Sequence, residues 1–197
     1  FFGNDTFYFV RIKNWDPNRM LGAVLDEPQT TRGAELFVYK SKFDSKFHCP
    51  DGEVTNADLV YSTKAFSLRR SGNFTRNAPK SSLKIGLTDE DDRLFSMKTL
   101  NLKSMVNDVS QMREAVACKS LGAIGLPATK HTYAKVCVND RYYGLYSVIE
   151  QIDKPFLKDH FGKNNDGNLY KAEWLDMGPA TLGLPPGGAT KGEQLFT

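Results

Sequence analysis

Short stretches in which apolar and polar residues alternate recur along the chain, and this period of two is typical of strands. The clearest early examples are residues 7–12, 21–26 and 35–40, which are rich in aromatic and β-branched side chains and separated by proline-containing turns. We expect a small antiparallel β unit here. The pattern therefore predicts a β-rich N-terminal segment over residues 1–58.

Two further strands are expected between residues 59 and 87, interrupted by turn residues at 71–73 and 77–79. In the second strand Lys80, Ser82 and Lys84 are spaced two residues apart. A period of two places these three on one face. The aliphatic positions Leu83, Ile85 and Leu87 are expected to form the core face.

Residues 108–121 have the spacing of a helix. Asp108 is expected to cap its first turn, with Gln111 as the partner in a capping box. Val109, Met112 and Val116 would form the apolar stripe that faces the core. Gly122 is the expected left-handed terminator.

The next pattern predicts a hairpin of residues 131–138 and 142–149, because Asn139-Asp140 supplies residues that tolerate positive φ. Asp153 is expected to cap a short helix that runs to Phe161. A last short strand is expected at 168–172. Residues 178–197 are rich in Gly and Pro at their start and are interpreted as a loop or linker.

Composition narrows the class of protein. The 197 residues are 40% hydrophobic, which is enough for a sizeable core. A net charge of +3 is too weak to indicate nucleic-acid binding by itself. No apolar run approaches the roughly 20 residues of a membrane-spanning helix. We therefore expect neither a nucleic-acid partner nor a membrane span.

The three cysteines are Cys49, Cys118 and Cys137. They show no Cys-x-x-Cys spacing and no clustering with histidine, so no metal site is expected. Cys118 and Cys137 lie in apolar surroundings, which favours buried free thiols; one disulfide plus one free thiol is the alternative. Asn4 and Asn73 begin glycosylation triplets, which would act as acceptors only in a secreted chain. Asn4 is expected to carry glycan more readily.

Cations gather around the glycine turn at residues 71–73. Arg70, Asn73, Arg76, Lys80 and Lys84 lie within fifteen residues of one another. A turn with free backbone N–H groups and flanking cations is suited to binding phosphate groups. The alternative is an exposed hairpin whose charges only contact solvent.

Several motifs in order resemble the CotH kinase family, whose members are similar to spore coat protein H and have an atypical kinase fold. Residues 70–75 and 79–82 resemble its Arg-Gly-Asn-x-Ser/Thr segment and its Lys-Lys-Ser strand. Residues 139–146 resemble its Asn-Gly-x-Tyr-Tyr-Gly-x-Tyr hairpin. Residues 149–157 resemble its Glu-Gln-x-Asp segment followed by Phe-Leu, and 166–171 its Asp-Gly-x-Leu-Tyr-Lys turn.

The resemblance implies an α+β fold: a mainly antiparallel kinase-like small lobe and the start of a large lobe, over residues 59–177. In such a fold the linker at Glu150, Gln151 and Ile152 would bind the adenine of ATP. Of the two lysines, Lys80 is expected to bind the nucleotide and Lys84 is the reserve. Mg²⁺ would accompany ATP in the full-length protein.

The family's catalytic and metal-binding carboxylates would follow Thr197, so no catalytic or metal residue is assigned, and residues 1–197 alone are expected to be inactive. The implied activity is ATP-dependent phosphorylation of Ser or Thr on coat or extracellular proteins, in a secreted or cell-surface protein. The alternative is a non-catalytic structural or adhesin-type protein on the same fold, which binds a surface partner.

Overall fold

The computed structural model describes residues 7–15, 29–30, 33–41, 49, 58–72, 78–89 and 93–169. The chain divides into two compact units, Phe1–Phe156 and Leu157–Thr197. Several expectations lie outside the described residues: the strand at 21–26, the side chains of Asn4, Asn73 and Arg76, and the linker at 178–197.

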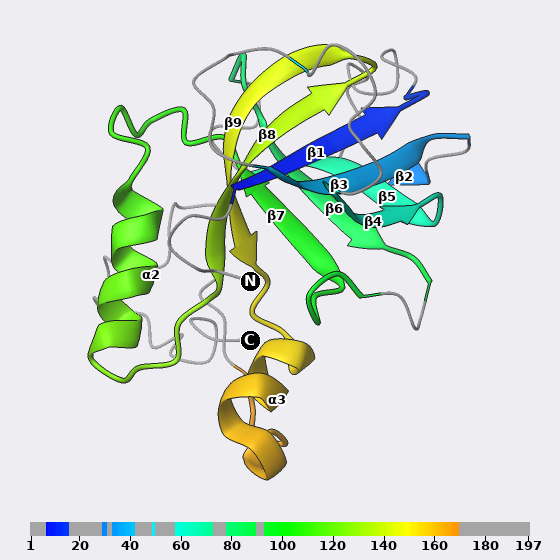
Figure 1. Cartoon of the computed structure of the whole chain (residues 1–197). Helices are drawn as coiled ribbons and strands as arrows, with labels where there is room; N and C mark the ends of the chain where they lie inside the picture. The colour runs from blue at the N-terminus through cyan, green and yellow to red at the C-terminus, as the bar shows by residue number, and fades with distance from the viewer. Residues whose placement is uncertain are drawn as a thin grey trace, which may run out of the picture. The chain divides into compact units, whose positions relative to one another are not determined.

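The described part of the first unit is dominated by one nine-stranded sheet, with the order β2-β5-β6-β7-β9-β8-β1-β3-β4 (Figure 1). The strands are β1 (Phe7–Lys13), β2 (Gln29–Thr30), β3 (Glu35–Ser41), β4 (Leu59–Thr63), β5 (Phe66–Ser71), β6 (Ser82–Leu87), β7 (Thr99–Lys103), β8 (His131–Val138) and β9 (Arg141–Glu150). Adjacent strands are antiparallel except β1 and β8, which are parallel. The expected mainly antiparallel β architecture is therefore present.

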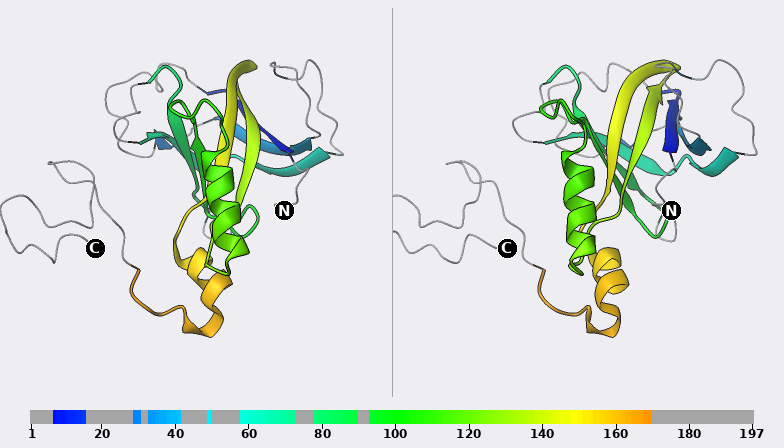
Figure 2. Two further views of the ribbon diagram at one scale, coloured as in Figure 1. Left: turned by 90° about the vertical axis from the view of Figure 1, so that its left-hand side faces the viewer. Right: turned by 60° about the vertical axis from the view of Figure 1, so that its left-hand side comes forward.

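The larger of two hydrophobic clusters lies on one face of this sheet, which curves strongly (Figure 2). Alternate residues of the strands point into one apolar cluster, as the period of two requires. Leu83, Ile85 and Leu87 are buried there, as the sequence predicts. The cluster also includes residues from β1 and β3, such as Ile12 and Leu36, so the N-terminal strands share the core of the rest of the unit.

The N-terminal strands are continuous with the sheet. β1 lies between β8 and β3, so the expected strands at 7–12 and 35–40 are confirmed. The Asn139 side chain accepts a bond from the Trp15 amide at 2.9 Å and donates to the Trp15 carbonyl. Arg11 forms an ion pair with Asp140. The domain boundaries expected near residues 58 and 177 stay predictions, because these contacts do not test them.

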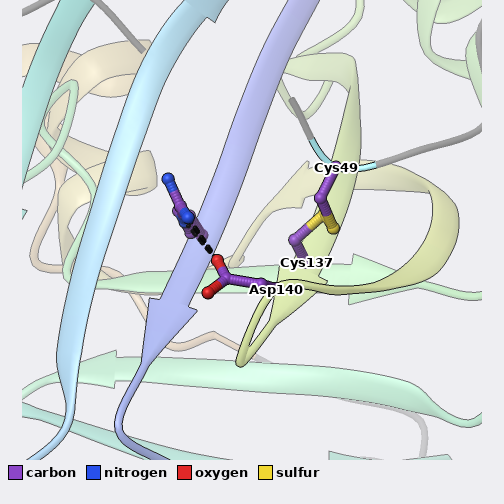
Figure 3. Close-up of a disulfide and its surroundings, with 4 residues drawn as sticks. Cys49, Cys137 and Asp140 are labelled. Carbon is purple, nitrogen blue, oxygen red and sulfur yellow. Dashed lines mark hydrogen bonds and ion pairs between the residues drawn. A yellow bond between two sulfur atoms is a disulfide. The ribbon is translucent and has the colours of Figure 1, made fainter. Parts of the chain in front are cut away.

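The β8–β9 hairpin forms as expected. Asn139 and Asp140 have φ of 48° and 62°, which both central residues of a type I′ turn require. Cys137 of β8 forms a disulfide with Cys49, with 6.0 Å between their Cα atoms (Figure 3). The interpretation of Cys137 as a free thiol is therefore wrong. Cys118 is a half-buried free thiol.

The expected helix is shorter and oriented differently. Helix α2 spans Arg113–Ala123 and buries none of its residues. Its N-cap residue is Met112, which makes no side-chain cap bond, so the cap and capping box expected at Asp108 and Gln111 are wrong. Asp108 instead accepts a bond from the Arg113 amide at 2.9 Å from outside the helix. The terminator is Gly125, with φ of +78°, rather than Gly122.

The predicted apolar stripe of α2 is exposed, which corrects the sequence interpretation. Val109 is 102% exposed, Met112 56% and Val116 53%. The half-buried positions are instead Glu114, Ala115 and Cys118. The half-buried side of the helix therefore consists of two small residues and one glutamate, and the predicted stripe is on its exposed side.

The expected helix after Asp153 is confirmed as α3 (Lys154–Phe161), and a short 3-10 helix, η3 (Gly162–Asn164), follows it. The Phe156 amide donates to Asp153 Oδ1 at 3.5 Å, so Asp153 acts as the cap. The predicted strand at 168–172 falls mostly outside the described residues.

Candidate functional site

The face of the sheet opposite the core carries a row of polar side chains. Cross-strand partners point to the same face of a sheet. The strand register joins five strands in one row, whose members are Arg69, Lys84, Asn101, Ile149 and His131. A second row joins Lys103, Ser147 and Tyr133. These two rows are called the polar face below.

Helix α2 is attached to the polar face at its β8 side. The Tyr133 hydroxyl donates to the Gln111 carbonyl at 2.6 Å, just before the helix begins. Cys118 Sγ lies 3.3 Å from Thr129 Oγ1, just before β8. Figures 1 and 2 show the helix beside this end of the sheet. The helix thus borders the polar face through few polar contacts.

Glu114 brings an acidic group from α2 to this border. Its Oε2 atom is buried without a hydrogen-bond partner among the described residues. Burial raises the pKa of Tyr133, and the charges of Asp108 and Glu114 raise it further. Glu114 is therefore close enough to act on a member of the polar face.

The segment after β9 is held by Glu150. This residue is 4% exposed. Its Oε1 lies 3.3 Å from Lys130 Nζ and its Oε2 accepts a bond from the Lys130 amide at 3.0 Å. The Glu150 side chain is therefore bound to Lys130, and these contacts hold the start of the linker in place.

Gln151 connects the linker to the polar face. Its Oε1 accepts bonds from Lys84 Nζ and from Asn101 Nδ2, both at 3.2 Å. The next residue, Ile152, is 47% exposed. Burial raises the pKa of Asp153, and Glu150 adds to this, whereas Lys84 and Arg93 act against it. Charged groups of both signs therefore converge at the linker.

Lys80 does not belong to the polar face. Its Nζ donates to the Leu145 carbonyl and lies 4.7 Å from the centroid of the Tyr146 ring. Burial lowers the pKa of Lys80. Tyr146 belongs to the apolar core and donates its hydroxyl to the Ser81 carbonyl at 3.2 Å. The structure therefore does not bring Lys80 and Lys84 together on one site.

The register also separates Arg70 from Lys84. Arg70 is paired with Leu83, which points into the core, whereas Arg69 is paired with Lys84. Two cations directly opposite each other on neighbouring strands repel, so this part of the face favours an anion.

Of the expected site residues, Lys84 and Gln151 are in contact and Ile152 follows directly. Asn73 and Arg76 lie outside the described residues.

Strand β7 and its Lys103 were missed by the sequence analysis. The signal was present, because Leu100 and Leu102 alternate with Thr99, Asn101 and Lys103, and both leucines are buried. The stretch is short and follows an irregular segment, and it was therefore not assigned.

The described residues contain neither a cluster of metal ligands nor a membrane-spanning helix. Within these ranges, no group of three or more His, Cys, Asp and Glu side chains is placed to hold a metal ion. In the same part of the chain, none of the helices combines the length and apolarity needed to cross a bilayer.

Comparison with models of known protein families gives a match over much of the chain. A family model described as "CotH kinase protein" matches residues 68–195, which is more than half of the chain. The matched region includes the polar face from Leu68 onward and the linker at 150–153. No curated protein matches the chain.

Proposed function

Because the chain belongs to the CotH kinase family, we propose that its polar face and linker form the nucleotide side of an ATP-dependent protein kinase. The proposed reaction is transfer of the γ-phosphoryl group to Ser or Thr of a coat or extracellular protein. Phosphoryl transfer needs cations on the phosphates, a segment that binds the adenine, and Mg²⁺. The first two requirements have candidates among the described residues.

The order of the elements is the observation that carries this proposal. Strand β5, a glycine turn, β6, β7, α2, the β8–β9 hairpin, the linker and α3 follow in the order of a kinase small lobe that leads into its large lobe. In protein kinases the phosphate lysine is on the third strand and pairs with a glutamate of the following helix. Here those positions belong to Lys103 of β7 and Glu114 of α2.

The contacts of the lysines support a ranking different from the one expected from the sequence. The Lys80 amine is already bonded to the Leu145 carbonyl and lies over a core aromatic ring. Lys84 and Lys103 instead belong to the polar face that α2 borders. We infer that Lys103 and Lys84 contact the nucleotide and that Lys80 supports the fold.

The residues of the polar face and linker include candidates for ATP contacts but none that is assigned as a magnesium ligand. Arg69, Lys84 and Lys103 offer positive charge for the triphosphate, and the linker at Ile152, a residue that is 47% exposed, is accessible to a base. When bound, Mg²⁺ would neutralise charge that develops on the transferred phosphoryl group. No residue described here is assigned as its ligand.

The proposed location is outside the cell or on its surface. The Cys49–Cys137 disulfide supports this, because disulfides persist in oxidising compartments and are rare in the cytosol. The glycosylation triplets at Asn4 and Asn73 are compatible with the same location and stay untested.

Calorimetric titration with ATP and Mg²⁺ tests the proposal. We expect saturable ATP binding that weakens about ten- to a hundredfold in Lys103→Met, the effect of losing one charge-assisted phosphate contact. The matched control is Lys64→Met, because Lys64 is an exposed lysine paired with Glu35 away from the polar face. Absence of ATP binding, or equal binding by both variants, would contradict the nucleotide site.

A second function, that of a surface-binding or adhesin-type protein, is favoured by one observation. Val109 and Met112, just before α2, and Val116 within it have exposed apolar side chains, and apolar groups gathered on a surface often mark interaction sites. The same titration separates the two functions, since a protein that is only a scaffold would not bind ATP.

A further inference from the structure

The orientation of the Gln151 amide is fixed by its neighbours. Asn101 Nδ2 donates to the Ile149 carbonyl at 3.3 Å, and because a carbonyl only accepts, this atom must be the nitrogen. The Lys84 ammonium also has donors only. Both groups lie 3.2 Å from the same atom of Gln151, which must therefore be its oxygen.

The amide nitrogen of Gln151 consequently points the other way, along the linker. Its Nε2 lies 3.4 Å from the Ile152 carbonyl oxygen, near the upper limit for such a bond. An amide nitrogen has two hydrogens and a carbonyl oxygen has two lone pairs. The pair therefore keeps one donor and one acceptor, side by side, at an exposed part of the chain.

We propose that Gln151 is a specificity-determining residue, whose fixed donor reads a nucleotide base together with the Ile152 carbonyl. The matching base edge has an amine donor beside an accepting ring nitrogen, as on the Watson–Crick edge of adenine. The inference rests on the proposed nucleotide site and adds its base preference.

A 6-oxo purine presents the opposite pattern. Hypoxanthine differs from adenine by a carbonyl in place of the 6-amine and by a hydrogen on N1. Its carbonyl would face the Ile152 carbonyl, and its N1–H would face the Gln151 donor. A binding site strongly rejects a ligand whose polar groups do not match its own, because the mismatched groups stay unpaired. The linker therefore selects the amino purine.

Gln151→Glu isolates the donor. Glutamate has the same shape and keeps an oxygen for Lys84 and Asn101, but it replaces the outward donor with an acceptor. The measurement is calorimetric titration of the wild-type protein and this variant with ATP and with inosine triphosphate, both with Mg²⁺. We expect wild type to prefer ATP at least about tenfold, and the variant to lose about tenfold or more of that preference.

Gln151→Met is the matched second variant, since it removes the donor and the acceptor together. We expect it to weaken ATP binding without improving binding of inosine triphosphate. Thermal melts of all three proteins check folding. A wild-type protein that binds neither nucleotide would overturn the proposed function and this inference together. Wild-type ATP binding with an unchanged preference in Gln151→Glu would overturn the inference alone.

Discussion

Lys80 and Lys84 are four residues apart and yet make unrelated contacts. The alternation that places them on one face holds only within a strand, and β6 begins at Ser82. Lys80 therefore lies before the strand and turns toward Leu145 and Tyr146. Gly144 has φ of +125°, and a Cβ there would lie 3.0 Å from Lys80 Cε. Glycine at this position thus allows the lysine to approach the backbone of β9.

Lys80→Met is expected to lower stability while leaving ATP affinity within about threefold of wild type. The substitution keeps the apolar stem but removes the bond to the Leu145 carbonyl and the cation–π contact, together about 1–3 kcal/mol. Chemical denaturation and ATP titration of the same variant give both values. Unchanged stability with ATP binding weakened tenfold would restore the ranking expected from the sequence.

His131 should make stability depend on pH. Burial lowers the pKa of His131, and the charge of Lys119 lowers it further; Ser147 Oγ lies 2.9 Å from its Nε2. The unfolded chain, with a pKa near 6.5, then binds the proton more readily than the folded chain. The contribution of neutral His131 to the free energy of unfolding is therefore fully present above about pH 6.5 and decreases as the pH falls below that value.

The variant His131→Gln is expected to lose part of this decrease, because glutamine does not titrate. Urea denaturation between pH 5 and 7.5 provides the comparison. All other residues are the same in both proteins, so the difference between the two pH profiles reports His131. A steeper acid loss in the variant than in wild type would contradict the assignment to His131.

At the scale of elements, helix α2 shows why an amphipathic pattern does not determine orientation. The sequence shows a stripe but not what faces it. In the structure the Tyr133 hydroxyl and Thr129 contact Gln111 and Cys118, which turns the opposite side of the helix outward. The apolar stripe is then left exposed.

Replacing this stripe by polar residues should cost little. We expect the double variant Met112→Gln, Val116→Gln to change the free energy of unfolding by less than about 1 kcal/mol, since exposed substitutions usually stay within ±0.5 kcal/mol each. Tyr133→Phe is the matched comparison and should cost about 0.5–1.5 kcal/mol through the lost bond to Gln111. A loss of several kcal/mol in the double variant would mean that the stripe is buried in solution.

Local patterns were sufficient for the hairpin and for the core face of β6. Asn139 and Asp140 determine their turn through their own φ preferences, and Leu83 and Ile85 are buried because their strand alternates. The polar face depends on the register between strands distant in sequence. No local pattern shows that Lys84 is opposite both Arg69 and Asn101. Gln151 was therefore named as a site residue without the contacts that orient its amide.

At the scale of the whole molecule, the first unit is closed by contacts of long sequence separation. β1 pairs in parallel with β8, more than a hundred residues later, which short-range patterns do not reveal. The disulfide is a second such contact, because Cys49 and Cys137 are 88 residues apart. It links a residue outside the strands to β8, beside the aromatic cluster of Phe9 and Tyr39.

Breaking the disulfide should destabilise the protein substantially. A cross-link over such a separation restricts the unfolded chain and typically contributes about 2–4 kcal/mol. For a chain of this size we expect Cys49→Ala, or reduction of wild type, to lower Tm by roughly 5–15 °C. Cys118→Ala is the control, because Cys118 is the free thiol and its removal leaves the cross-link intact.

Thiol titration of the denatured protein gives an independent check of the pairing. With three cysteines in the chain, we expect one reactive thiol before reduction and three after it. The Cys118→Ala variant should then show none before reduction. Three thiols in unreduced wild type, together with an unchanged Tm in Cys49→Ala, would contradict the disulfide. That result would also remove the structural support for an extracellular location, because the cross-link is what indicates an oxidising compartment.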